Sequence, residues 1–121
     1  MAEVIEIFKA LADETRLRIL KLLLEVEERV CVCELVDALG LPQYRVSRHL
    51  NTLKRAGLLE GERSGTWVYY SPVRDAPPLI AGLFPVIKDR LVLETFAKDL
   101  KRLRERLELR VDGVCVVGYE R

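Results

Sequence analysis

The chain has 121 residues, 50% of them hydrophobic and 32% charged, with a net charge of +1, the profile of a globular protein with room for one domain but not two. No apolar run reaches the roughly 18 residues that cross a bilayer, and the first residues lack the pattern of a secretory signal, so we expect no membrane partner and a cytosolic location. Three cysteines, an odd number, argue against a disulfide scaffold.

Two helices are predicted at the start of the chain. Helical spacing predicts the first over residues 2–11, and its apolar residues are Val4, Ile5, Phe8 and Leu11. Asp13 is a good N-cap for the second, which we expect over residues 14–26 with a broad apolar face. A polar break follows, and residues 29–32 are expected to form a short strand or an extended link.

The next segment predicts a helix-turn-helix unit over about residues 33–57. A short helix from Glu34 to Leu39 ends at Gly40, which suits a left-handed cap position. Pro42 suits the first turn of a new helix, which we expect from about Gln43 to Ala56. Its buried residues would be Val46, Leu50 and Leu53. Two short helices joined by a tight turn that contains glycine are typical of this motif.

A hairpin directly after the second helix predicts a wing over about residues 58–71. Its two strands are expected over Leu58–Arg63 and Thr66–Ser71, joined across Ser64-Gly65. The aromatic and β-branched residues of the second strand have high β-propensity, which supports this interpretation.

The rest of the chain predicts a long helix over about residues 78–110, in which a kink would fall at Pro85. Its apolar residues follow a heptad spacing that can face a partner chain or fold onto the same protomer; they are Leu93, Phe96, Leu100, Leu103 and Leu107. Asp112-Gly113 is expected to end this helix, and residues 114–119 to add a short strand. The predicted fold class is therefore mainly α (α+β): one winged helix-turn-helix domain over residues 1–121, with a two-stranded β-wing and a long C-terminal helix.

Positive charge is concentrated in the predicted reading helix and wing. Residues 1–40 have five Lys/Arg against nine Asp/Glu, giving −4, and residues 41–70 have five against two, giving +3. A recognition helix enters the major groove with its N-terminus first, which favours contacts from that end. We expect DNA contacts from Gln43, Tyr44, Arg45, Ser47 and Arg48, and from Arg63 in the wing. The alternative is a solvated polar face on a packing helix.

His49 is the single histidine of the chain and follows Val46 by three residues. It therefore lies near the core edge of the predicted helix, where it either packs against the core or contacts DNA. We treat both roles as open and include His49 among the candidate DNA-binding residues.

Cys31 and Cys33 lie one residue apart at the start of the helix-turn-helix unit. In a helix two such side chains point about 200° apart, whereas in a strand they share a face, so both sulfurs can bind one ion only if the local backbone is not helical. We therefore expect ion binding to unwind the first turn of the 34–39 helix and to move the reading helix out of register with the groove. Cys115 is either a third sulfur ligand or a small hydrophobic residue in an apolar run.

Three linked motifs within about residues 5–72 resemble the ArsR/SmtB family of metalloregulators. They are Phe8–Leu20, Val46–Leu50 followed by Leu53–Leu59, and Cys31–Leu35, which resembles the Cys-Val-Cys-Asp-Leu box of the arsenical-resistance repressors. The resemblance implies a homodimeric winged-helix repressor that leaves an inverted-repeat DNA operator when it binds its inducer. It also implies that the first and last helices form the dimer interface, here through Val4, Phe8, Leu93, Phe96, Leu100, Leu103 and Leu107.

The chain departs from the family pattern in two places. Val36 occupies the position of a further cysteine, three residues after Cys33, and residues 78–110 contain no histidine, which argues against the zinc and nickel sites of the family.

The cysteines indicate a thiophilic inducer and no permanent cofactor. As(III) or Sb(III), supplied as arsenite or antimonite, accepts two or three thiolates, whereas zinc and cadmium generally need four donors. The alternatives are a DNA-binding regulator that responds to thiol oxidation or to a soft divalent metal, and a winged-helix protein-interaction module that does not bind DNA. An enzyme is not expected, because a catalytic cysteine needs a nearby base and His49 lies on a different helix.

Overall fold

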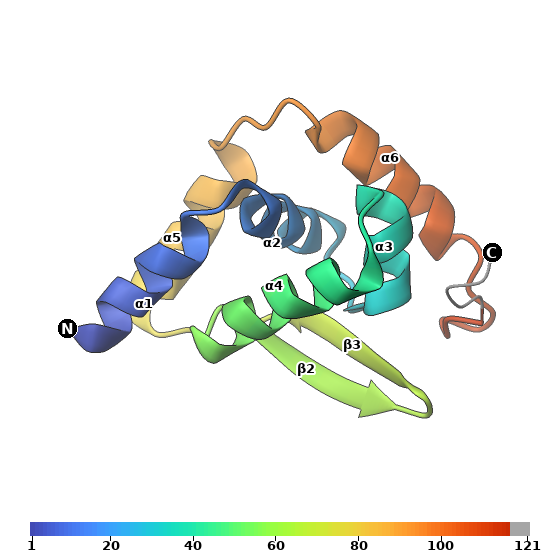
Figure 1. Ribbon diagram of the computed structural model, residues 1–121, viewed down its shortest axis with the longest axis horizontal. Coiled ribbons are helices and arrows are strands. Elements are labelled where there is room, and N and C mark those ends of the chain that lie inside the picture. Colours follow the sequence, from blue (N-terminus) through green and yellow to red (C-terminus); the bar gives the residue numbers. More distant parts are fainter. Residues whose placement is uncertain (117–121) are drawn as a thin grey trace.

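The computed structural model describes residues 1–116 of the chain, and within them six helices lie on one side of a small sheet (Figure 1). The helices are α1 (Ala2–Leu11), α2 (Glu14–Val26), α3 (Val32–Leu39), α4 (Gln43–Arg55), α5 (Pro78–Asp89) and α6 (Phe96–Leu107). The strands are β1 (Val30–Cys31), β2 (Leu59–Ser64) and β3 (Trp67–Pro72). The prediction of a mainly α winged helix-turn-helix fold is confirmed.

Local signals account for most helix boundaries in the first half of the chain. The Asp13 carboxylate accepts a hydrogen bond from the Arg16 amide at 3.0 Å and caps α2. Helix α3 ends at Gly40, whose φ of 68° is the left-handed conformation that glycine adopts without steric cost. The place where the chain leaves α3 and turns towards α4 is therefore specified locally, by Gly40.

The sheet has three antiparallel strands in the order β1-β3-β2, one more than the predicted wing. The segment expected to be a strand or a link is the short strand β1, which pairs Val30 with Tyr70 and Cys31 with Tyr69. Because β1 leads directly into α3, this pairing attaches the start of the helix-turn-helix unit to the wing strand β3 (Figure 1).

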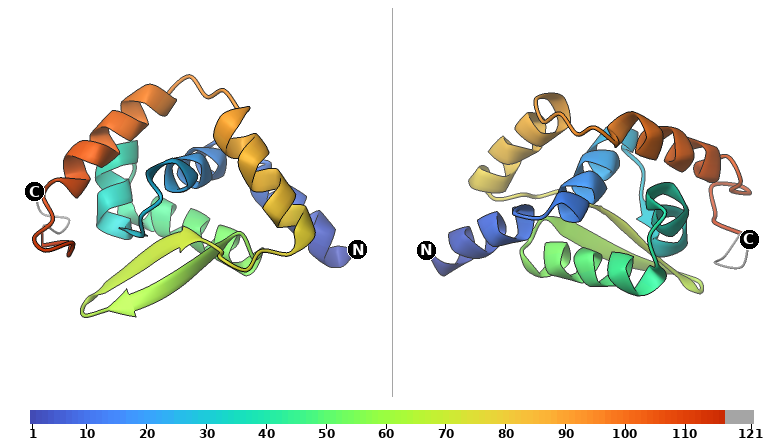
Figure 2. Two further views of the ribbon diagram at one scale, coloured as in Figure 1. Left: turned by 180° about the vertical axis from the view of Figure 1, so that it is seen from behind. Right: turned by 45° about the horizontal axis from the view of Figure 1, so that its top comes forward.

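The prediction of one long C-terminal helix is wrong. Helix α5 contains Pro85 without ending there, and residues 90–95 separate it from α6. The Lys21 ammonium group of α2 donates hydrogen bonds to the carbonyl oxygens of Ile87 and Lys88, at 3.3 and 2.6 Å, which satisfies carbonyls that the end of α5 leaves free. The chain can therefore turn here, and α6 folds back alongside α3 (Figure 2).

The heptad stripe packs onto its own protomer, which is the alternative that the spacing left open. Leu103 is fully buried in the core, and Phe96, Leu100 and Leu107 are partly buried against the same core. The expected partner contact is therefore wrong for Leu103, which no second chain can reach. Leu93 lies in the segment between α5 and α6.

Two further predictions concern the end of the C-terminal helix and the residues that follow it. The prediction that Asp112-Gly113 ends the C-terminal helix is wrong: α6 already ends at Leu107, and Val111 and Val114 form an isolated bridge around a turn at Asp112-Gly113. The strand expected over residues 114–119 lies partly outside the described residues. Within residues 1–116 no helix is both long and apolar enough to cross a membrane.

Candidate metal centre and DNA interface

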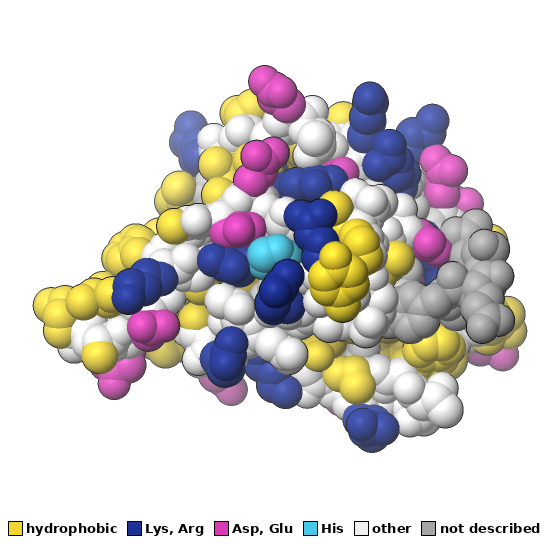
Figure 3. Space-filling view, in the orientation of Figure 1, with side chains coloured by type: hydrophobic (Ala, Val, Ile, Leu, Met, Phe, Trp, Pro, Cys, Tyr) yellow, Lys and Arg dark blue, Asp and Glu magenta, His cyan; other side chains and the backbone are white. Residues whose placement is uncertain are grey.

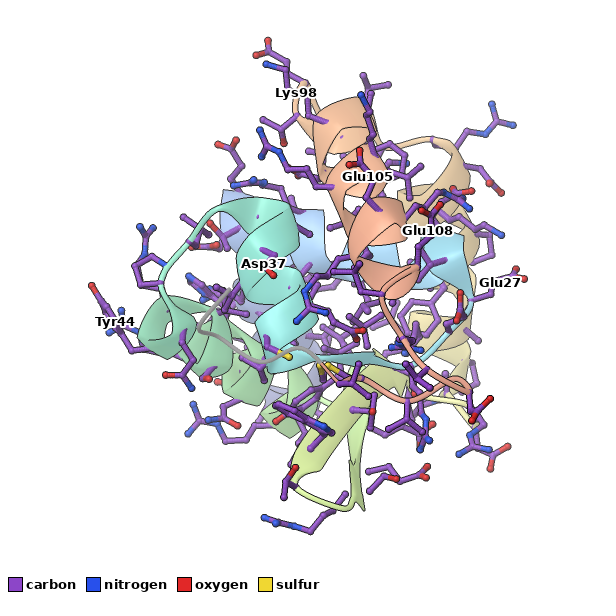
Figure 4. All side chains as sticks on the ribbon, turned by 90° about the vertical axis from the view of Figure 1, so that its right-hand side faces the viewer. Glu27, Asp37, Tyr44, Lys98, Glu105 and Glu108 are labelled. Carbon is purple, nitrogen blue, oxygen red and sulfur yellow. The ribbon has the colours of Figure 1, made fainter. Side chains whose placement is uncertain are left out.

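The three cysteines meet in one buried cluster, which we call the thiol cluster: Cys31, Cys33 and Cys115. The Cys31 and Cys33 sulfurs are 2.9 Å apart, those of Cys33 and Cys115 are 3.4 Å apart, and all three lie within 4.8 Å of one another. Each side chain is about 1% exposed. Figure 4 shows the sulfur atoms between the start of α3 and the sheet. The structure thus brings Cys115, 82 residues away in sequence, to the predicted pair.

The two neighbouring sulfurs converge without any unwinding of α3. Cys31 is the N-cap residue, with extended φ and ψ of −89° and 165°, whereas Cys33 lies in the first helical turn. The helix begins at Val32, two residues before the predicted start, and the change of backbone conformation falls between the two cysteines. The expectation that binding must unwind the first turn of α3 is therefore wrong, because the sulfurs already face one another.

Cys115 reaches the cluster on a segment that follows α6 and turns at Asp112-Gly113. Its backbone amide donates a hydrogen bond of 3.1 Å to the Tyr69 hydroxyl oxygen on β3. Tyr69 is itself about 1% exposed and packs with the three cysteines, beside Trp67.

Two buried ion pairs attach the C-terminal part of the chain to α3 next to the thiol cluster. Glu34 is completely buried; it accepts hydrogen bonds from Arg110 at 2.7 and 2.8 Å and from the Cys31 amide at 3.0 Å. Burial opposes ionisation of Glu34, but these bonds outweigh it and the pKa of the carboxyl group is lowered. Arg106 donates to Asp37 at 2.6 Å, and Figure 4 shows Asp37 on the side of α3 that faces α6.

The three thiols differ in acidity. The pKa of Cys33 is lowered to about 6, because the Cys31 thiol donates a hydrogen bond to its sulfur and Cys115 and the positive charge of Arg106 add to this effect against burial. The pKa of Cys31 is raised, since its thiol is the donor of that bond and is buried, and burial also raises the pKa of Cys115. Cys33 is therefore the most acidic of the three thiols.

The predicted DNA-binding residues of α4 line its outer, polar face. A shallow groove there is lined by Gln43, Tyr44, Ser47, Arg48, Asn51, Lys54 and Arg55. The Tyr44 side chain is 65% exposed and points away from the protein (Figure 4). In Figure 3 lysine and arginine side chains surround the single histidine on this face. Arg45 is partly buried, and Arg63 is exposed on the wing strand β2.

His49 has a packing partner at the edge of this face. Its Nδ1 atom is 3.2 Å from the Arg16 guanidinium group of α2, which also donates to carbonyl oxygens at the end of α1. Burial lowers the pKa of His49, and the positive charges of Arg16, Arg48 and Arg45 add to this effect while Asp13 opposes it. Since the Arg16 guanidinium group can only donate, Nδ1 is the acceptor of this contact, and the His49 ring remains partly exposed beside the predicted DNA-binding residues.

Exposed apolar side chains gather on α1 and α5 instead of α6. Ile5 and Phe8 on α1 are 47% and 50% exposed, and Leu79 and Val86 on α5 are 39% and 53% exposed. Val4 is partly buried. Both helices lie at the end of the molecule where the chain begins (Figures 1 and 2), and yellow atoms cover that end in Figure 3.

Sequence reasoning missed four residues around the thiol cluster: Glu34, Tyr69, Arg106 and Arg110. The pattern Cys31-x-x-Glu34 has the spacing of a capping box with cysteine in place of serine, so Glu34 had a local signal. The other three act across 37 or more residues: Tyr69 pairs with Cys31 through the sheet and Arg106 and Arg110 arrive on or after α6, so no local pattern reveals them.

The helix-turn-helix unit, the wing and the polar face of α4 define the class of winged-helix DNA-binding regulators. A family profile described as "Bacterial regulatory protein, arsR family" matches residues 13–60. An uncharacterized HTH-type transcriptional regulator of Methanocaldococcus jannaschii is 51% identical over 70 residues, which cover 58% of this chain and 78% of the relative. The arsenic resistance transcriptional regulator ArsR1 of Pseudomonas putida is 41% identical over 99 residues, which cover 82% of this chain and 76% of the relative.

The solved structures agree with this assignment. HlyU from Vibrio cholerae superposes with a TM-score of 0.61 and 30% sequence identity, over 71% of this chain and 88% of HlyU. The chain belongs to the ArsR family of bacterial regulatory proteins, and is a transcriptional repressor of the ArsR/SmtB type, not an enzyme.

Proposed function

We propose that this protein is a homodimeric repressor that dissociates from its operator when As(III) or Sb(III), supplied as arsenite or antimonite, binds the thiol cluster. The observation that carries the proposal is the meeting of three buried sulfurs within 4.8 Å at the first helix of the reading unit. The arsenic resistance regulator of Pseudomonas putida, 41% identical, supports the same class of inducer.

The number and type of donors favour a trivalent metalloid. The cluster offers three soft sulfur donors, and no histidine or carboxylate belongs to it among residues 1–116. Arsenous acid exchanges three hydroxyl groups for three sulfurs and releases three water molecules; each thiol supplies one proton, or solvent supplies it where a thiol is already ionised. Three thiolates neutralise a trivalent ion, whereas a divalent ion leaves one negative charge in a buried site, which is costly.

The neighbouring charges do not remove that preference. Glu34 and Asp37 are the nearby carboxylates, and each is already paired, with Arg110 and Arg106 respectively. A complex without net charge therefore suits the cluster better than a charged one.

For DNA, we propose that the N-terminal half of α4 enters the major groove. Gln43, Tyr44, Ser47 and Arg48 are positioned to contact base edges, with Arg45, His49 and Arg63 contributing contacts to the backbone or to an adjacent groove. A dimer with two-fold symmetry then requires an inverted-repeat operator.

For the dimer, we propose a surface that keeps α1 of the predicted interface and replaces the heptad residues with α5. It consists of the exposed side chains of Ile5, Phe8, Leu79 and Val86, with the partly buried Val4 beside them. Apolar side chains that are half exposed at one end of a protein are typical of a surface that a second copy covers.

Inducer binding can act on DNA affinity through the spacing of the sulfurs. Around a trivalent arsenic bound by three sulfurs at about 2.3 Å, a pyramid with angles of about 95° sets neighbouring sulfurs about 3.4 Å apart. The Cys33–Cys115 distance of 3.4 Å already matches this spacing, whereas the Cys31–Cys33 distance of 2.9 Å is shorter. Arsenic in the cluster therefore moves the Cys31 sulfur away from that of Cys33, and these two residues lie at the start of α3.

Thiol oxidation is a second candidate, which two observations favour. The Cys31 and Cys33 sulfurs are 2.9 Å apart, and the pKa of Cys33 is lowered to about 6. A thiolate is the reactive form towards oxidants. With peroxide, the two thiols would form a disulfide while the peroxide is reduced to two water molecules.

The test uses a duplex selected for binding from a pool of randomised inverted repeats. We expect one equivalent of arsenite to weaken operator binding by about 5-fold to 150-fold, the usual range of allosteric coupling, as measured by fluorescence anisotropy. Cys31→Ser and Cys33→Ser should bind DNA normally and lose the response, and Cys115→Ser should need more arsenite. Zinc and peroxide are the control ligands for the wild type.

Three outcomes would count against the proposal. Equal arsenite responses in all three serine variants would remove the thiol cluster as the site. Release by peroxide alone, reversed by reductant, would assign the protein to oxidant sensing. The absence of duplex binding at any salt concentration would leave a protein-interaction module, since a DNA binder weakens steeply as salt rises.

A further inference from the structure

Tyr69 contacts two members of the thiol cluster, Cys31 and Cys115. Its backbone pairs with Cys31 across β1 and β3, and its hydroxyl oxygen accepts the hydrogen bond from the Cys115 amide at 3.1 Å. Directly opposed residues of antiparallel strands place their side chains on the same face of the sheet, which explains how the Tyr69 ring reaches over Cys31 to residue 115.

The Tyr69 ring is held in place by two arginines. The guanidinium groups of Arg29 and Arg110 lie 4.4 and 5.5 Å from the centre of the ring. Arg110 also donates to Glu34 and to the Arg29 carbonyl oxygen, both at 2.7 Å. The ring therefore moves together with the start of α3 and with the segment after α6, not independently of them.

Tyr69 also belongs to the wing. On its other edge β3 pairs with β2, where Glu62 is the partner of Tyr69 and Arg63 is the next residue towards the tip. The Arg29 side chain that stacks on the ring forms an ion pair of 2.8 Å with Glu62. A displacement at Tyr69 is thus passed directly to the strand that carries the candidate DNA contact Arg63.

We propose that Tyr69 is a positioning residue of the thiol cluster: its hydroxyl holds Cys115 against β3 as the third sulfur donor of the same protomer, and couples separation of the sulfurs to the wing. This inference rests on the proposed function, since it specifies how the third donor is supplied and where the signal goes. The inference predicts that ion binding displaces the wing as well as α3.

The test compares Tyr69→Phe with Tyr70→Phe. Both substitutions remove one hydroxyl from adjacent residues of β3, but Tyr70 packs in the main core and Tyr69 on the cysteines. The first readout, without DNA, is the number of thiols per chain that one equivalent of arsenite protects from a thiol reagent. We expect three in the wild type and in Tyr70→Phe, and two in Tyr69→Phe.

The second readout is the arsenite concentration that releases half of the selected duplex. We expect Tyr69→Phe to bind the duplex as the wild type does without arsenite. It should need about 3-fold to 10-fold more arsenite for release, the range that one lost hydrogen bond implies. The thiolate-to-arsenic absorption in the ultraviolet should weaken in parallel, an effect that a general loss of stability does not produce.

The outcomes separate this inference from the proposed function. If Tyr69→Phe protects three thiols and releases DNA at the wild-type arsenite concentration, the role of Tyr69 is overturned while arsenite sensing stands. If arsenite protects no thiol in the wild type, arsenite sensing itself fails.

A measurement on the wild type covers the case in which Tyr69→Phe does not fold. Hydrogen exchange of the Cys115 amide should be slow without arsenite, because the amide is bonded to Tyr69, and slower still with it. Exchange at the rate of a free peptide in both states would overturn the inference.

Discussion

Helices α4 and α6 are of similar length, 13 and 12 residues, and both are basic, but they use their charges differently. Helix α4 has four Lys/Arg and no Asp/Glu, and the residues it buries are all apolar. Helix α6 has five Lys/Arg with two Asp/Glu, and buries Asp99 and Arg106 beside Leu103. The comparison shows that a basic composition alone does not identify the predicted DNA-binding face: α6 buries one of its arginines in an ion pair with Asp37, whereas α4 buries none of its basic residues.

The largest expected effect concerns the charge that α6 buries. Asp99 accepts hydrogen bonds of 2.9 and 3.0 Å from Arg18 of α2, and the two side chains are 2% and 14% exposed. Asp99→Asn leaves the Arg18 charge largely buried without its partner, so we expect a loss of about 3–5 kcal/mol in the free energy of unfolding. Urea denaturation followed by circular dichroism measures it.

Glu105→Gln is the matched control, since Glu105 lies on the same helix and is exposed. We expect this substitution to change the free energy of unfolding by less than about 0.5 kcal/mol. Equal stability of the two variants would mean that the charges of α6 do not hold it in the fold, and the contrast with α4 would disappear.

An effect of intermediate size should separate the two helices in DNA binding. Arg48 on α4 and Arg102 on α6 are both exposed arginines. Arg48→Ala should weaken binding to the selected duplex by about 1–3 kcal/mol, the value of one arginine contact to a base, without lowering the unfolding free energy. Arg102→Ala should leave both quantities unchanged.

Fluorescence anisotropy at one fixed salt concentration compares the two variants. Equal losses of affinity would show that net charge alone, and not the face of α4, governs binding to the duplex.

The smallest effect is a pH dependence at the edge of the α4 face. The pKa of His49 is lowered from its ordinary value of 6.5, first by burial and then by neighbouring arginines. A lower pKa in the folded chain means that neutral His49 stabilises the fold. This contribution is fully present above pH 6.5 and is lost as the pH falls through the folded-state pKa.

His49→Gln should therefore flatten the decrease in unfolding free energy as the pH falls below 6.5. Urea titrations of the wild type and the variant measure this difference. They are carried out at several pH values between about 7.5 and 5, the range over which an ordinary histidine titrates. A wild-type curve parallel to that of the variant would show that the Arg16–His49 contact does not depend on the charge of the imidazole.

The helix-turn-helix unit and the Cys31–Cys33 pair can be recognised from local sequence signals. Asp13 caps α2 and Gly40 ends α3, and the apolar residues Val46 and Leu50 orient α4, all through interactions within a few residues of chain. Such local signals specify helix ends and buried faces, so the helix-turn-helix unit and the polar face of α4 were predictable.

The positions of α6 and Cys115 depend on contacts that form only in the folded chain. The heptad stripe showed that a face of α6 is buried but carried no information on what covers it, because an apolar face packs against any complementary apolar surface. The partners that settle the question are distant in sequence: Glu34 and Arg110 are separated by 76 residues, and Cys33 and Cys115 by 82. Contacts over such separations form only when the chain has folded, and for that reason the third sulfur and the role of Tyr69 follow from the structure alone.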